Sequence, residues 1–303
     1  MASNIQPFTY CIWQDRQGSA MADLYISLFG GKKGATTYYT KAGIEEHGQA
    51  EGSEMAVSFE IGGLQLMALS AGPMFRPNPS ISFSVICETE AEVDRLWTEL
   101  VKDGKVMMPL DKYDWSARYG FLEDRFGVSW QLMLGKLSDV GQPITPTFLF
   151  VKDRFGQAEA AVRQYTDLFP QSTIVGMLKH QEGPYKDTVL HTQFKLNNQV
   201  FMAMDGPGEH QFGFTEGFSI MVNCPDQETI DYYWEKLGAG GDPNAQVCGW
   251  LKDRFGVSWQ IVPTELEQMM LDPDKSKVER VTNAFMSMKK LDLAAIRKAY
   301  AGQ

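Results

Sequence analysis

The stretch DRFGVSWQ at residues 124–131 occurs a second time, unchanged, at residues 253–260. Identity over eight consecutive positions is too long to be coincidental, so the chain contains an internal repeat. Residues upstream of the two copies recur in the same order: Cys87, Asp94, Trp97 and Leu100 correspond to Cys224, Asp231, Trp234 and Leu237. We therefore expect two related modules at residues 1–137 and 145–264, followed by a C-terminal extension at 265–303.

A linker and a tail separate and follow these modules. The joint KLSDVGQPITP, residues 136–146, contains one glycine and two prolines, which is typical of a linker. In the extension, apolar residues recur at helical spacing over 278–288 and again over 293–300. We expect two amphipathic helices that pack on the second module, with a homodimer contact through them as the alternative.

Each module shows the same order of secondary structure twice. Residues 55–61 alternate between apolar and polar, a Gly62-Gly63 turn follows, and residues 64–69 form the next expected strand. Apolar residues at 93, 96, 97 and 100 predict a helix between strands. Each module is thus expected to be βαβββ repeated twice, giving four such units in the chain. Tight hairpins between strands favour an α+β fold with mixed sheets and helices on one face.

Composition narrows the class of protein and its partners. The chain has 303 residues, 28 Lys and Arg, 38 Asp and Glu, and a net charge of −10. Nucleic acids and anionic membranes require clustered basic residues, which are absent from this sequence, so we expect neither as a partner. The sequence shows neither a secretory signal nor a CxxC pair among its four cysteines, which favours a reduced, cytoplasmic protein with inert thiols.

The repeated βαβββ order ending in D-x-F-G-x-x-W resembles the vicinal oxygen chelate superfamily, which includes glyoxalase I, bleomycin-resistance proteins and extradiol dioxygenases. The sequence is most similar to the PhnB-like branch, whose domain often carries the name 3-demethylubiquinone-9 3-methyltransferase. The likeness covers residues 5–136 and 145–300. The resemblance implies tandem modules of this fold and, in metal-dependent members, His or Glu ligands on four strands.

The ligand positions that the resemblance implies are occupied here by other residue types. The last-strand positions are Gln131 and Gln260, and the strands PFTYCIW, TPTFLFV, ISFSVIC and FSIMVNC contain no His, Asp or Glu. We therefore expect no metal site of the family type and no other cofactor. A methyltransferase would need a Gly-rich turn that opens a helix, whereas the run GAGG at 238–241 follows an expected helix, so methyl transfer is disfavoured.

Strand alternation predicts which side chains face the cavity of this fold. In the second module, His191 and Gln193 oppose the apolar face of their strand, and polar residues on two further strands share the corresponding side. The expected ligand-binding residues are His191, Gln193, Ser219, Met221, Asn223, Ser258 and Gln260 in the second module, with Ser58, Glu60 and Gln131 in the first.

Two functions follow from this face, and the sequence leaves both open. One is the binding of a small aromatic or antibiotic-like molecule without metal, because the expected face offers hydrogen bonds and apolar surface with little charge. The alternative is a glyoxalase- or lyase-type enzyme, metal-dependent or with His191 as general base, since the ordinary pKa of histidine lies near neutrality.

Overall fold

The computed structural model describes residues 5–303 and contains four βαβββ units in sequence, as expected. The first comprises β1 (Thr9–Gln14), α1 (Gly18–Phe29), β2 (Lys32–Tyr38), β3 (Glu54–Ile61) and β4 (Leu64–Ser70), with α2 (Ile44–His47) before β3. The second comprises β5 (Ile81–Cys87), α3 (Glu90–Leu100), β6 (Lys105–Tyr113), β7 (Ser116–Glu123) and β8 (Ser129–Leu134). The third, after α4 (Leu137–Val140), comprises β9 (Ile144–Phe150), the 3₁₀ turn η1 (Lys152–Arg154), α5 (Ala158–Leu168), β10 (Thr173–Lys179), β11 (Val189–Leu196) and β12 (Gln199–Asp205). The fourth comprises β13 (Phe218–Cys224), α6 (Gln227–Gly238), β14 (Asp242–Val247), β15 (Trp250–Lys252) and β16 (Ser258–Pro263), and α7 (Leu266–Met270), α8 (Lys275–Met286) and α9 (Leu293–Ala301) follow it.

The four units combine into two eight-stranded mixed sheets, and each sheet draws on both repeats. One sheet has the order β14-β15-β16-β13-β1-β4-β3-β2, and the other has the order β10-β11-β12-β9-β5-β8-β7-β6. In the first sheet β1 pairs antiparallel with β13, whereas β1–β4 and β13–β16 are parallel. The fold is therefore α+β with mixed sheets, as the sequence predicts.

The compact units of the structure do not follow the sequence repeats. One unit contains the described residues up to Arg76 together with Glu216–Gln303, and we call it the N–C unit. The other contains Pro77–Thr215, and we call it the middle unit. The expected modules at 1–137 and 145–264 therefore describe repeats in sequence, while each compact unit combines half of one repeat with half of the other.

Helices cover one face of each sheet. In the N–C unit, α1 packs on β2–β4 and α6 packs on β13, β15 and β16. Alternation along the strands buries Tyr10, Ile220 and Trp259 completely on this helix side. The residues next to them in sequence lie on the opposite face, which is where a site can form.

The repeated DRFGVSWQ stretch forms the same hairpin in both units, held by hydrogen bonds to a buried aspartate. Asp253 is buried, and its Oδ1 accepts hydrogen bonds from the backbone N–H groups of Phe255 (2.9 Å) and Val257 (3.0 Å), while its Oδ2 accepts one from Trp259 Nε1 (2.8 Å). Gly256 has a φ of 91°, in the left-handed region that glycine adopts without steric cost. The motif is thus explained by one buried carboxylate that ties a turn to the strand after it.

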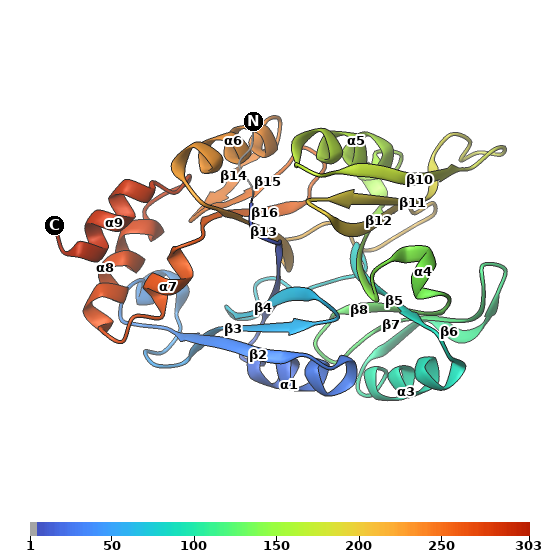
Figure 1. Ribbon diagram of the computed structural model, residues 1–303, viewed down its shortest axis with the longest axis horizontal. Helices are drawn as coiled ribbons and strands as arrows, with labels where there is room; N and C mark the ends of the chain where they lie inside the picture. Colours follow the sequence, from blue (N-terminus) through green and yellow to red (C-terminus); the bar gives the residue numbers. More distant parts are fainter. Residues whose placement is uncertain (1–4) are drawn as a thin grey trace. The chain divides into compact units, whose positions relative to one another are not determined.

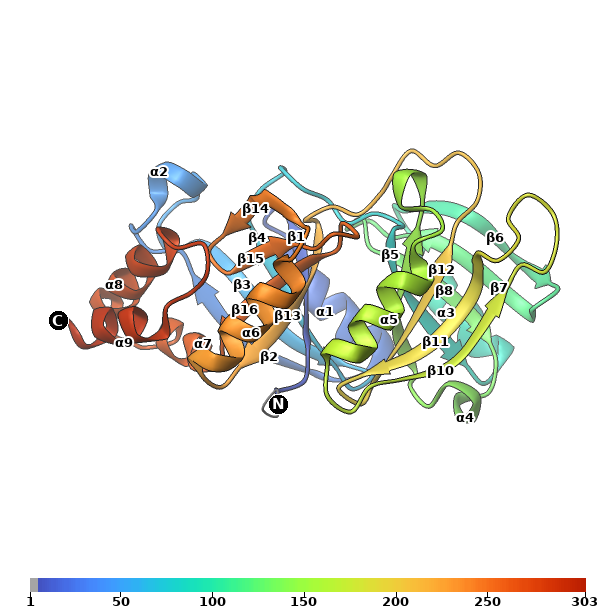
Figure 2. The same cartoon turned by 90° about the horizontal axis from the view of Figure 1, so that it is seen from above.

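The C-terminal extension forms α7–α9, which gather at the end of the N–C unit beside α6 (Figures 1 and 2). The helices at α8 and α9 confirm the predicted periodicity, whereas α7 was not predicted. A small apolar core of Met269, Val281, Leu291 and Ile296 is buried between them. Gln227 on α6 accepts a hydrogen bond from the backbone N–H of Leu293 at 2.8 Å, which fixes the extension to the sheet's own helix. The described residues include no helix that is both long and apolar enough to cross a membrane.

Candidate functional site

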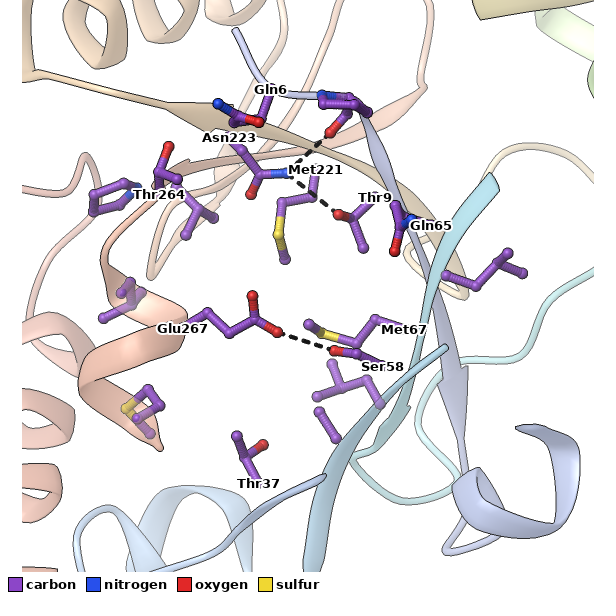
Figure 3. Close-up of a pocket in the computed structure, with 18 of the residues that line it drawn as sticks. Gln6, Thr9, Thr37, Ser58, Gln65, Met67, Met221, Asn223, Thr264 and Glu267 are labelled. Carbon is purple, nitrogen blue, oxygen red and sulfur yellow. Dashed lines mark hydrogen bonds between the residues drawn. The ribbon is translucent and has the colours of Figure 1, made fainter. Parts of the chain in front are cut away.

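A cavity of about 490 Å³ opens on the face of the N–C sheet that the helices α1 and α6 leave uncovered (Figure 3). Strands β1, β2, β3, β4, β13 and β16 supply its walls, and α7 and Thr264 supply another side. The lining residues are mainly apolar or neutral and polar: Gln6, Pro7, Thr9, Thr37, Met55, Ala56, Ser58, Gln65, Leu66, Met67, Leu69, Met221, Asn223, Val262, Pro263, Thr264, Leu266, Glu267 and Met270.

Strand register explains how residues from both repeats meet here. Thr9 on β1 pairs with Gln65 of β4 on one side and with Met221 of β13 on the other. Paired residues on neighbouring strands point to the same face, so these three side chains stand in one row across the sheet. The antiparallel contact between β1 and β13 therefore creates the site by joining the first repeat to the second.

A hydrogen-bonded amide fixes one end of the cavity. Asn223 Nδ2 donates to the backbone oxygen of Pro7 at 3.2 Å and to Thr9 Oγ1 at 3.3 Å. Figure 3 shows its side-chain oxygen turned toward the cavity interior. The amide is thus held in one orientation, with an acceptor directed at the space a ligand would occupy.

The C-terminal extension contributes a carboxylate to the opposite side of the cavity. Ser58 Oγ on β3 donates a hydrogen bond to Glu267 Oε1 on α7 at 3.2 Å. Figure 3 shows Met67 and Met221 reaching into the same space from the strands. Glu267 is not among the predicted ligand-binding residues, because residues 265–303 were expected only to form packing or dimer helices.

Three of the predicted ligand-binding residues, Ser58, Met221 and Asn223, line this cavity. Glu60 lies on the same strand as Ser58 but is engaged at the surface with Gln65 and Lys32, and these hydrogen bonds hold its pKa below the ordinary value. Ser219 and Ser258 belong to the same sheet and are fully buried, and neither lines the cavity.

Gln260 and Gln131, the last-strand positions, join neighbouring parallel strands. Gln260 is buried, and its Nε2 donates to Ser219 Oγ at 2.9 Å. In the middle unit, Gln131 Nε2 donates to Ser82 Oγ at 2.9 Å, and its Oε1 accepts from the Tyr119 hydroxyl at 2.9 Å. Both amides therefore have internal partners.

His191 and Gln193 lie on β11 in the middle unit, whereas Gln260, Ser219 and Asn223 belong to the N–C unit. Burial lowers the pKa of His191, which favours its neutral form. Gln193 Nε2 donates to the backbone oxygen of Val140 at 3.2 Å. These residues were predicted to share one module because each repeat was expected to fold as a separate unit. In the structure, each sheet contains strands from both repeats.

The donor atoms do not fit a metal centre of the glyoxalase type. No group of three or more His, Cys, Asp or Glu side chains converges anywhere in the part of the chain that the structure describes. On β1 the corresponding face carries Thr9 and Cys11, and burial raises the pKa of the Cys11 thiol to about 12, which disfavours the thiolate that a metal binds. The Gln260 and Gln131 amides at the last-strand positions are engaged by Ser219, Ser82 and Tyr119.

The glycine-rich run at residues 238–241 lies at the end of a helix and in the turn after it. Helix α6 ends at Gly238, and Gly240 adopts a φ of 73° in the turn that follows. A Cβ at Gly241 would lie 2.0 Å from the backbone oxygen of Lys252, so this glycine permits close packing of two chain segments. The run therefore follows a helix, as the sequence predicts.

Comparison with known proteins agrees with the fold. The family model described as 3-demethylubiquinone-9 3-methyltransferase matches residues 6–133 and again 136–262. A PhnB protein from Bacillus cereus is 30% identical over 43% of this chain and 100% of its own, with a TM-score of 0.39. Glyoxalase I from Zea mays has a TM-score of 0.54 at 11% identity, covering 89% of this chain and 96% of its own.

A further structure, named as a dioxygenase of Bacillus subtilis, has a TM-score of 0.50 at 12% identity and covers 92% of this chain and 96% of its own. The comparison with curated proteins gave no match. At such identities these likenesses concern the fold. Because the family model covers most of the chain in two copies, this protein belongs to the 3-demethylubiquinone-9 3-methyltransferase family, and its fold is that of the glyoxalase and dioxygenase proteins of the vicinal oxygen chelate type.

Proposed function

We propose that the protein binds a small, mainly apolar organic molecule, such as an aromatic compound, in the cavity of the N–C unit. The observation that carries this proposal is the convergence of apolar walls with a few fixed hydrogen-bonding groups around about 490 Å³. Ligand pockets of this kind typically measure about 300–1,000 Å³ and combine the same two features.

Methionines give the cavity walls an adaptable apolar surface. Met55, Met67, Met221 and Met270 all line the cavity, and the Thr282 hydroxyl contacts the Met270 sulfur at 3.8 Å. Unbranched thioether side chains adjust their shape and make favourable contacts with aromatic rings. The set therefore supports an aromatic or otherwise flat ligand.

The neutral polar groups supply orientation. The Asn223 amide is anchored by Pro7 and Thr9, so it can present its oxygen to a ligand donor without first losing side-chain freedom. Ser58 and Gln65 add further hydrogen-bonding groups on β3 and β4. These groups would select among ligands of similar size by their hydrogen-bonding pattern.

We do not assign a catalytic step to this cavity. His191, the candidate general base, belongs to the middle unit and does not line the cavity. The family name refers to methyl transfer, for which a glycine-rich turn that opens a helix would be expected. The turn at Gly240 follows a helix instead. Binding is the function that the lining residues support best.

The test is a thermal-shift and calorimetric screen of neutral aromatic alcohols, phenols and quinones with two variants. Met67→Trp replaces a thioether side chain in the cavity with a larger indole, whereas Met177→Trp makes the same change on β10 in the middle unit. Compounds that stabilise the native protein by mass action should lose this effect in Met67→Trp and keep it in Met177→Trp. Binding that survives Met67→Trp unchanged would refute this assignment.

A further inference from the structure

The carboxylate of Glu267 stands alone among the cavity's charges. Of the described residues that line the cavity, Glu267 is the single ionisable acid, and none is Lys, Arg or His. The contact resolved at its side chain is the hydrogen bond from the neutral Ser58 hydroxyl. A negative charge therefore faces an otherwise neutral pocket.

The position of this carboxylate is fixed by the packing of the extension. Met269, two residues after Glu267, is buried in the core of α7–α9 with Val281 and Leu291. Glu265, two residues before it, is paired with Arg297 on α9, with 2.6 Å between the carboxylate and guanidinium. Because both neighbours are anchored, α7 holds Glu267 at the edge of the cavity.

We propose that the C-terminal extension makes the cavity selective for an organic cation. The apolar body of such a ligand lies over Met67 and Met221, and its ammonium group approaches the Glu267 carboxylate. This inference rests on the proposed function, and it adds the chemical class of the ligand and a role for the extension. A carboxylate lacking a basic partner favours a positive charge and repels a negative one.

The test uses three probes that share an indole body and differ in charge: tryptamine, tryptophol and indole-3-acetate. At pH 7 an aliphatic amine is protonated and a carboxyl group is ionised, so the probes carry positive, zero and negative charge. Isothermal titration with the full-length protein should give the affinity order tryptamine, tryptophol, indole-3-acetate. Because Glu267 is solvent-exposed at the cavity edge, the preference for tryptamine over tryptophol should be about three- to fivefold.

Two variants separate a local charge from the acidity of the whole protein. Glu267→Gln should bring the ratio of tryptamine affinity to tryptophol affinity close to one. Glu235→Gln removes the same charge from the exposed side of α6 and should preserve the preference. In the native protein, raising salt should shrink the preference, which is an independent measurement if either variant folds poorly.

The outcomes distinguish this inference from the proposed function. Equal affinity for all three probes, with Met67→Trp still abolishing binding, would overturn the cation preference and leave the cavity as the binding site. A preference that persists in Glu267→Gln would also overturn it. If none of the probes binds, or if Met67→Trp leaves their binding unchanged, the proposed function itself fails and this inference fails with it.

Discussion

Replacing Asp253 by asparagine tests whether the repeated motif is explained by its buried carboxylate. Oδ1 of Asp253 accepts two backbone hydrogen bonds, and Oδ2 accepts the 2.8 Å bond from Trp259 Nε1. In Asp253→Asn the retained oxygen can keep the two backbone bonds, but the new amide nitrogen is a donor and cannot accept from the indole. The variant thus leaves a buried indole N–H without its partner.

The expected loss follows from the hydrogen bond to a charged group and the cost of the unsatisfied donor. Together they predict a decrease of about 2–4 kcal/mol in the free energy of unfolding. Urea unfolding followed by tryptophan fluorescence measures it. Asp124→Asn should cost a similar amount, because the Asp124 carboxylate accepts from Trp130 Nε1 at 2.9 Å.

The chain provides its own control in a third Asp-Arg-Phe-Gly, at residues 153–156. The Asp153 side chain is 78% exposed and forms no such lock, so Asp153→Asn should change stability by less than about 0.5 kcal/mol. If Asp253→Asn were as stable as Asp153→Asn, our explanation of the motif would be refuted.

Two further predictions concern the middle unit. Gly120→Ala places a Cβ 2.4 Å from the Trp97 ring and should lower the free energy of unfolding by about 1–3 kcal/mol. Gly176→Ala is the control, because its Cβ meets no atom within 4 Å, and it should not lower the free energy of unfolding. Equal urea midpoints for the two variants would contradict the expected clash with Trp97. Burial lowers the folded-state pKa of His191 below its ordinary value of 6.5, so the unfolded chain binds a proton more readily. The contribution of neutral His191 to stability should be intact above pH 6.5 and should decrease as the pH falls toward the folded-state pKa. Between about pH 7.5 and 5.5, the melting temperature of His191→Gln should therefore fall less than that of the native protein. An equal fall in both proteins would contradict this expectation.

Local signals in the sequence were sufficient to predict the four βαβββ units and the two longer helices of the extension, but not the short helix α7. The Gly62-Gly63 turn predicted from the strand pattern has a positive φ at both glycines, and the corresponding Asn197-Asn198 turn of the second repeat has φ values of 48° and 65°. The four βαβββ units follow from periodicity and the repeat. These features depend on neighbouring residues, which is why one sequence sufficed.

The candidate site was only partly predictable because it depends on long-range pairing. Ser58, Met221 and Asn223 were identified from strand alternation, but their association with Thr9 depends on β1 pairing with β13, more than 200 residues away. A repeat shows which residues are equivalent, but it does not show which halves of the two repeats pair in one sheet. Glu267 was missed because it lies outside the repeat, on a short helix whose function depends on where it packs.

We propose that one cavity, built from both repeats in the N–C unit, binds the ligand. Methyl NMR of protein labelled at methionine tests it directly during titration with tryptamine. We predict that Met67 from the first repeat and Met221 from the second shift together with a single affinity, while Met133 and Met177 of the middle unit do not respond. Shifts confined to Met133 and Met177 would contradict the account.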